Sequence, residues 1–125
     1  MARKRKHSLP FDDRGGKITI CGVLLKSQNY LTLSANSRSL MTLLHVHWRN
    51  EKLVDYGVRE ASTKLQCDEK TARKAFDQLQ ERGFLVCEEY ALFNSRLGSK
   101  SRSWRLTWLP FNYNKPSNDW EKWND

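Results

Sequence analysis

The chain has 125 residues, of which 38% are hydrophobic and 11% aromatic, and it carries a formal net charge of +8. This length has room for one small core and leaves little for a second domain, and no apolar run approaches the ~18 residues of a membrane span. The basic start is not followed by a hydrophobic segment, so we expect no secretory signal there. The positive charge favours a polyanionic partner, chiefly nucleic acid or an anionic membrane surface.

Residues 1–16 are expected to form a loosely held basic arm. The arm contains a run of four cations: Arg3, Lys4, Arg5 and Lys6. Such an arm would follow the phosphate backbone of a nucleic acid or reach into a minor groove, and its contribution would be non-specific and sensitive to salt. The alternative is a tail that only keeps the protein in solution.

The next segment is predicted to lead into a helix. Ile18 and Ile20 alternate with polar residues, which predicts a short strand or an extended segment on the core within residues 17–33. Ser34 is suited to cap a helix running from about Ala35 to Trp48. Its buried side is expected to hold Leu40, Met41, Leu44, His47 and Trp48, with His45 on the other face. Residues 50–57 are read as a connector, in which residues 52–54 would form one brief strand.

Residues 58–86 contain two short helical patterns separated by a break at residues 65–67. The second pattern has an apolar stripe at helical spacing, formed by Ala72, Ala75, Phe76 and Leu79. Asp68 is placed to cap its start and Gly83 to end it. Four residues near its N-terminal end face away from the stripe: Lys70, Thr71, Arg73 and Lys74. This is the pattern of a helix-turn-helix whose second helix enters the DNA major groove, and the alternative is a helical hairpin with a solvated basic face.

The period changes after Gly83. Residues 84–92 read as a strand, and Trp104, Leu106 and Trp108 alternate with polar residues in a second one. The loop between them carries three cations, Arg96, Lys100 and Arg102, and residues 91–110 contain no acid. A hairpin in this place is expected to be a wing that rests on the DNA backbone, as opposed to a solvated hairpin tip.

Residues 112–125 form a tail with two tryptophans, Trp120 and Trp123. Ser117 before an Asn-Asp-Trp-Glu run favours a short capped helix. The tryptophans would dock on the core, or they would form an exposed aromatic patch for a protein partner or a second copy of the chain.

The cysteines and histidines do not have the spacing of a metal site. Cys21, Cys67 and Cys87 are far apart and odd in number, which predicts reduced, mostly buried thiols. The chain also lacks the glycine-rich, nucleophile-elbow and zinc-protease motifs. We therefore expect no enzyme activity and no cofactor.

Three segments together resemble a known family: SRSLMTLLHVHW, VREASTKLQCDEKTARKAFDQLQERGFL and KSRSWRLTWLPFNYNKPSNDWEKW. They are similar to small bacterial winged helix-turn-helix proteins of phages, prophages, plasmids and other mobile elements, over roughly residues 23–123. The resemblance implies that fold, DNA binding, and a role in phage or plasmid transcription or replication control. The positions matching groove-facing residues are Glu69, Lys70, Thr71, Arg73 and Lys74. Glu69 stands where such helices often carry Ser or Arg, and an acid there would accept from a cytosine N4 amine or repel phosphate.

The sequence thus predicts an α+β protein with a winged helix-turn-helix fold, that is, a three-helix core, a β-hairpin wing and a short C-terminal helix. Residues 1–16 would be the arm, 17–111 the domain and 112–125 the tail. We expect a cytoplasmic bacterial regulator of transcription that binds double-stranded DNA through a recognition helix at about residues 68–82. Two alternatives are a DNA-binding accessory of replication or excision, and a protein-interaction module that uses the tail or a homodimer contact.

Overall fold

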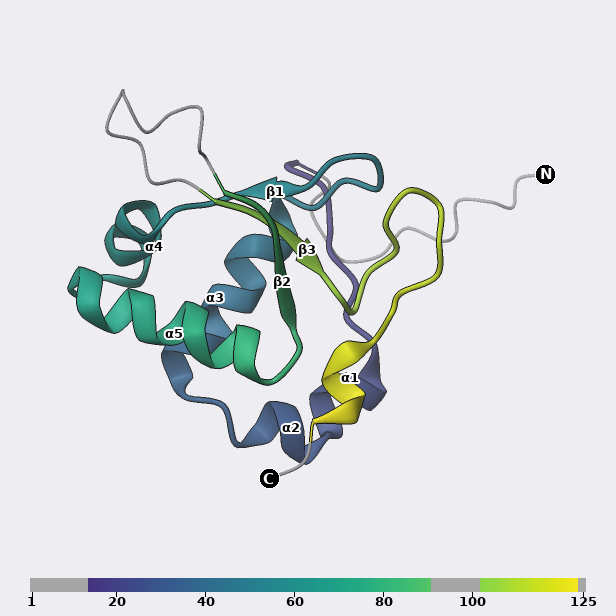
Figure 1. Ribbon diagram of the computed structural model, residues 1–125, viewed down its shortest axis with the longest axis horizontal. Coiled ribbons are helices and arrows are strands. Elements are labelled where there is room, and N and C mark those ends of the chain that lie inside the picture. Colours follow the sequence, from purple (N-terminus) through teal and green to yellow (C-terminus); the bar gives the residue numbers. More distant parts are fainter. Residues whose placement is uncertain (1–13, 91–101, 124–125) are drawn as a thin grey trace.

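The computed structural model describes residues 14–90 and 102–123, and it is an α+β arrangement of short helices against a small sheet (Figure 1). The helices are α1 (Gly22–Lys26), α2 (Gln28–Leu31), α3 (Ala35–Val46), α4 (Val58–Leu65) and α5 (Glu69–Glu81). The strands are β1 (Val54–Asp55), β2 (Leu85–Tyr90) and β3 (Arg102–Leu106), and a short 3-10 helix, the tail helix, spans Asp119–Lys122.

The three strands form one antiparallel sheet in the order β1-β3-β2. In the register of β2 with β3, Leu85 lies opposite Leu106 and Cys87 opposite Trp104, and the register shifts between Cys87 and Glu89. The predicted brief strand before α4 forms two residues later than expected, as β1. The reason is that the chain first turns back on itself, where the Lys52 N–H donates to the Arg49 carbonyl at 3.4 Å.

Aromatic stacking joins the sheet to α5. The Trp104 indole lies parallel to the Phe76 ring, with 5.0 Å between ring centroids and 13° between the planes. Both side chains are almost fully buried, and the Trp104 indole N–H donates to the Tyr56 carbonyl at 3.0 Å. The buried face of α5 is the predicted one, because Ala72, Ala75, Phe76 and Leu79 all lie in the core.

The prediction of a strand or extended segment in residues 17–33 is wrong for most of that run. Residues 16–20 have no regular secondary structure, and α1 and α2 follow. Ser27 begins α2 as its N-cap, since its hydroxyl accepts from the Tyr30 N–H at 3.2 Å. Leu24 of α1 is buried whereas its neighbour Val23 is 64% exposed, and α2 has no buried residue, so this apolar run does not form a strand face.

The positions of the two histidines after Leu44 are the reverse of those predicted. Ser34 caps α3 as expected, but the helix ends at Val46, and His47 at its C-cap is exposed. His45 is 5% exposed. The buried residues of α3 follow the spacing i, i+3, i+4, i+7, i+8. This spacing includes position 45 and omits position 47. The buried residues are Ser37, Leu40, Met41, Leu44 and His45.

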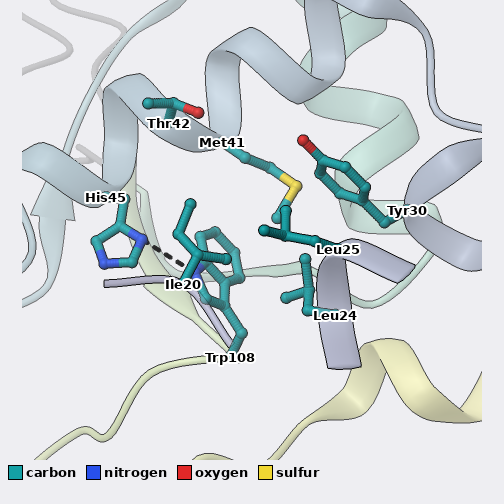
Figure 2. A pocket seen from close by; sticks show the side chains of 8 residues that line it. All are labelled: Ile20, Leu24, Leu25, Tyr30, Met41, Thr42, His45 and Trp108. Carbon is teal, nitrogen blue, oxygen red and sulfur yellow. Dashed lines mark hydrogen bonds between the residues drawn. The ribbon is translucent and has the colours of Figure 1, made fainter. Parts of the chain in front are cut away.

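His45 is held in its neutral form. Burial lowers the pKa of its imidazole below the ordinary value of 6.5, and the Trp108 indole N–H donates to His45 Nδ1 at 3.2 Å (Figure 2). A protonated imidazole would present a second donor to that N–H. The strand predicted to include Trp108 ends at Leu106, so Trp108 lies in the turn after β3, and it is still buried.

Lowering the pH is therefore expected to reduce the free energy of unfolding. The unfolded chain binds a proton at His45 near pH 6.5 and the folded chain only at a lower pH, so the stability present above about 6.5 is lost as the pH falls through this window. Urea unfolding at about pH 7.5 and pH 5 measures the loss. His45→Gln should reduce this pH dependence, whereas His47→Gln, at an exposed position, should retain it. Equal pH dependence in both variants would contradict the assignment.

The tail docks on the body of the protein, which confirms the intramolecular alternative. Trp120 is 4% exposed and stacks on Phe84, with 5.8 Å between centroids and 4° between planes. The Trp123 ring lies under the Arg82 guanidinium, at 4.2 Å. The Asn29 side-chain amide donates to the Trp120 carbonyl at 2.6 Å. The helix starts one residue later than predicted, with Asn118 as its N-cap in place of Ser117.

Candidate nucleic-acid interface

The α4–α5 unit consists of two helices joined by a tight turn. Gln66 ends α4 in the left-handed conformation, with φ 59° and ψ 48°, and the Cys67 N–H returns to the Ser62 carbonyl at 3.0 Å. Asp68 then caps α5, its carboxylate accepting from the Thr71 N–H at 2.7 Å. Hydrogen bonding with Thr71, through its side chain and then its backbone, lowers the pKa of the Asp68 carboxyl. Both predicted helices and the Asp68 cap are confirmed.

The C-terminal end of α5 is closed by Gly83. Its φ is +84°, the Gly83 N–H donates to the Gln80 carbonyl at 3.1 Å and the Phe84 N–H to the Leu79 carbonyl at 2.9 Å. This pair of bonds is a Schellman motif, for which glycine is the favoured residue. The predicted end of the helix is confirmed.

A polar junction with α3 fixes the position of α5. The Gln78 side-chain oxygen accepts from the Ser37 hydroxyl at 2.6 Å and from the Ser34 N–H at 3.0 Å. Ser37 is fully buried. One glutamine thus holds the capped start of α3 to the last turn of α5, and the orientation of the exposed side of α5 is set by the core.

The predicted basic residues lie on that exposed side. Lys70, Arg73 and Lys74 are exposed and Thr71 is half-buried. The opposite face of α5 is in the core, so these side chains point outward from a helix that is anchored on its other face and capped at both ends. The structure brings together Lys70, Thr71, Arg73 and Lys74 as the sequence predicts.

Glu69 has a partner that the sequence analysis did not identify. Its Oε2 lies 3.5 Å from Nε of Arg59, in the first turn of α4. As the first residue of α5, Glu69 also places negative charge where the helix dipole favours it. Lys64, in the last turn of α4, is a further exposed cation of the unit. The helical spacing of α4 is enough to predict that Arg59 and Lys64 are exposed, but not that Arg59 pairs with Glu69.

The open ends of β2 and β3 lie on the same side of the view as α4 and the N-terminal end of α5 (Figure 1). Arg102 opens β3, and its guanidinium carbon is 5.9 Å from the centroid of the Trp104 ring. It is the one predicted loop cation within the described residues. The other loop and arm cations of the prediction lie outside them: Arg96, Lys100, Arg3, Lys4, Arg5 and Lys6.

An apolar hollow near His45 is too small to hold an organic ligand. It is lined by side chains of α1, α2 and α3 together with Ile20 and Trp108 (Figure 2). Its volume is about 10 Å³, space for no more than a single water molecule.

Across residues 14–90 and 102–123, no three His, Cys, Asp or Glu side chains gather in a group that could hold a metal ion. All helices of the same part are too short or too polar to cross a membrane. The cysteines are thiols, of which Cys67 and Cys87 are half-buried, while Cys21 is exposed, contrary to the prediction.

Comparisons of the chain with protein-family models, with curated proteins and with solved structures gave no match.

Proposed function

We propose that this protein binds double-stranded DNA as a winged helix-turn-helix protein, with α5 as the recognition helix in the major groove. The observation that carries the proposal is the exposed basic front of α5, formed by Lys70, Arg73 and Lys74. A helix of this class reads DNA with its N-terminal residues while the preceding helix crosses the backbone. Here α4 precedes α5 by a tight turn, both helices pack on α3, and α5 also packs on β2 of the sheet.

The positive charge and the hairpin support the same proposal. A net charge of +8 attracts a polyanion such as DNA and favours its association with the protein. The ends of β2 and β3 that lead into the connecting segment lie on the side of α4 in Figure 1. In the proposed complex the predicted wing cations Arg96, Lys100 and Arg102 would rest on the flanking backbone. In this arrangement Lys70, Thr71 and Lys74 contact base edges or nearby phosphates, and Arg73 contacts the backbone.

The role we propose is regulation of transcription in a phage or other mobile element, on the strength of the sequence resemblance. The use of the tail as a partner surface loses support, because Trp120 is buried and Trp123 is covered on one side by Arg82. Accessory roles in replication or excision use the same fold, so the target sequence has to distinguish them.

The proposal is tested by titrating the full chain into fluorescently labelled random-sequence duplex DNA over a range of salt concentrations. Anisotropy should report binding at low salt, and the logarithm of the association constant should fall linearly with the logarithm of the salt concentration. A slope corresponding to several displaced counterions would support backbone contact by the basic surface. Absence of binding at low ionic strength would exclude the proposed function.

A further inference from the structure

Arg59, in the first turn of α4, has a backbone held by hydrogen bonds and a side chain exposed to solvent. The Arg59 carbonyl accepts from the Ser62 and Thr63 hydroxyls, at 2.9 and 3.1 Å. The Arg59 side chain is nevertheless 90% exposed, and the contact of its Nε with Glu69 Oε2 is the ion pair between α4 and α5. A guanidinium in this position can turn toward another anion without disturbing the helix that carries it.

The geometry of the Arg59–Glu69 ion pair allows Arg59 to exchange its partner. It uses Nε at 3.5 Å, and the Glu69 side chain is itself 50% exposed. An exposed pair of this kind contributes little to stability, because water and salt screen it. A guanidinium binds phosphate through two parallel N–H donors, which is a stronger arrangement than the contact it makes with Glu69.

We propose that Arg59 exchanges Glu69 for a DNA backbone phosphate when α5 enters the major groove. This inference rests on the proposed function and adds α4 to the contact surface. In the free protein Glu69 holds Arg59 beside the start of α5. On DNA the guanidinium moves to the phosphate, and Glu69 remains at the front of α5 next to Lys70. Glu69 is therefore an internal anion that competes with DNA for Arg59.

The exchange is tested with Arg59→Ala, Glu69→Gln and the double variant, in the same salt series with random-sequence duplex. Lys26→Ala and Glu81→Gln are matched controls, since both residues are exposed and lie outside the α4–α5 front. Arg59→Ala should weaken binding several-fold at low salt and reduce the salt slope by about 0.9, the value for one phosphate contact. Glu69→Gln should strengthen binding, and this gain should be smaller in the Arg59→Ala background.

Three outcomes would overturn the inference, and they differ in what they say of the function. If Arg59→Ala behaves as Lys26→Ala does while loss of Lys70 and Lys74 still weakens binding, DNA binding stands and the role of Arg59 is wrong. If Glu69→Gln strengthens binding equally in both backgrounds, Glu69 acts only by repelling phosphate and no exchange occurs. If the unaltered protein does not bind duplex DNA, the proposed function and the inference fail together.

Discussion

Replacing both Lys70 and Lys74 by alanine is expected to weaken binding to duplex DNA roughly 100-fold at low salt. Each charge-assisted contact is worth about 1.5 kcal/mol, which is close to tenfold in affinity. The salt slope should fall by about 1.8 if both lysines contact phosphates, and by about 0.9 if only one of them does. The fold should be unaffected, because both side chains are exposed and alanine is the best helix former. Anisotropy titrations measure the effect, with circular dichroism to verify the helix content.

A control with the same loss of charge separates the α5 front from general attraction. Lys26, at the end of α1, and Lys122, in the tail helix, are exposed. Both elements lie on the opposite side of the view from α4 in Figure 1. The Lys26→Ala/Lys122→Ala double variant should retain nearly the full affinity and slope. Equal losses in the two double variants would mean that DNA responds to net charge alone, and that α5 has no special part in binding.

Gly83→Ala is expected to lower the free energy of unfolding by about 2–4 kcal/mol, from backbone strain and overpacking together. The φ of Gly83 is +84°, and a Cβ built there would lie 2.8 Å from the backbone oxygen of Asp119 and 2.9 Å from its carbonyl carbon. Relief of that contact has to move the tail helix, and with it the stack of Trp120 on Phe84. Urea unfolding followed by tryptophan fluorescence measures the loss of stability.

Gly22 provides the matched control for this substitution. It is the first residue of α1, and a Cβ built there has nothing within 4 Å. Gly22→Ala should leave stability unchanged or raise it by about 0.4–1 kcal/mol, because alanine restricts the unfolded chain. If Gly83→Ala lowers the free energy of unfolding no more than Gly22→Ala does, the close contact of Asp119 with Gly83 at the end of α5 would be contradicted.

The parts of the fold that the sequence predicts well are those with local signals. Asp68 and Gly83 are capping residues whose preference depends on the backbone at their own position. The apolar stripe of α5 depends only on helical spacing. For this reason the bounds and buried face of α5 agree with the prediction.

The parts that the sequence does not predict depend on contacts between distant segments. The four residues of α2 are too few for a helix that is stable alone. Two hydrogen bonds of Asn29 hold α2 in place: its side-chain amide donates to the Trp120 carbonyl, and its backbone carbonyl accepts from the Arg82 guanidinium at 3.0 Å. The partner of Glu69 likewise follows from how α4 crosses α5. Neither pairing has a signature in the spacing of residues along the chain.

The bond between Asn29 and the Trp120 carbonyl joins residues 91 positions apart. Contacts at such separation form slowly, since a long stretch of chain must first be brought to closure. The chain is also synthesised from its N-terminal end, so α2 and the end of α5 emerge from the ribosome well before the tail that covers them. During that interval Phe84 lacks Trp120, its stacking partner. We therefore expect this junction to assemble in a late step of folding, after the α4–α5 unit has formed.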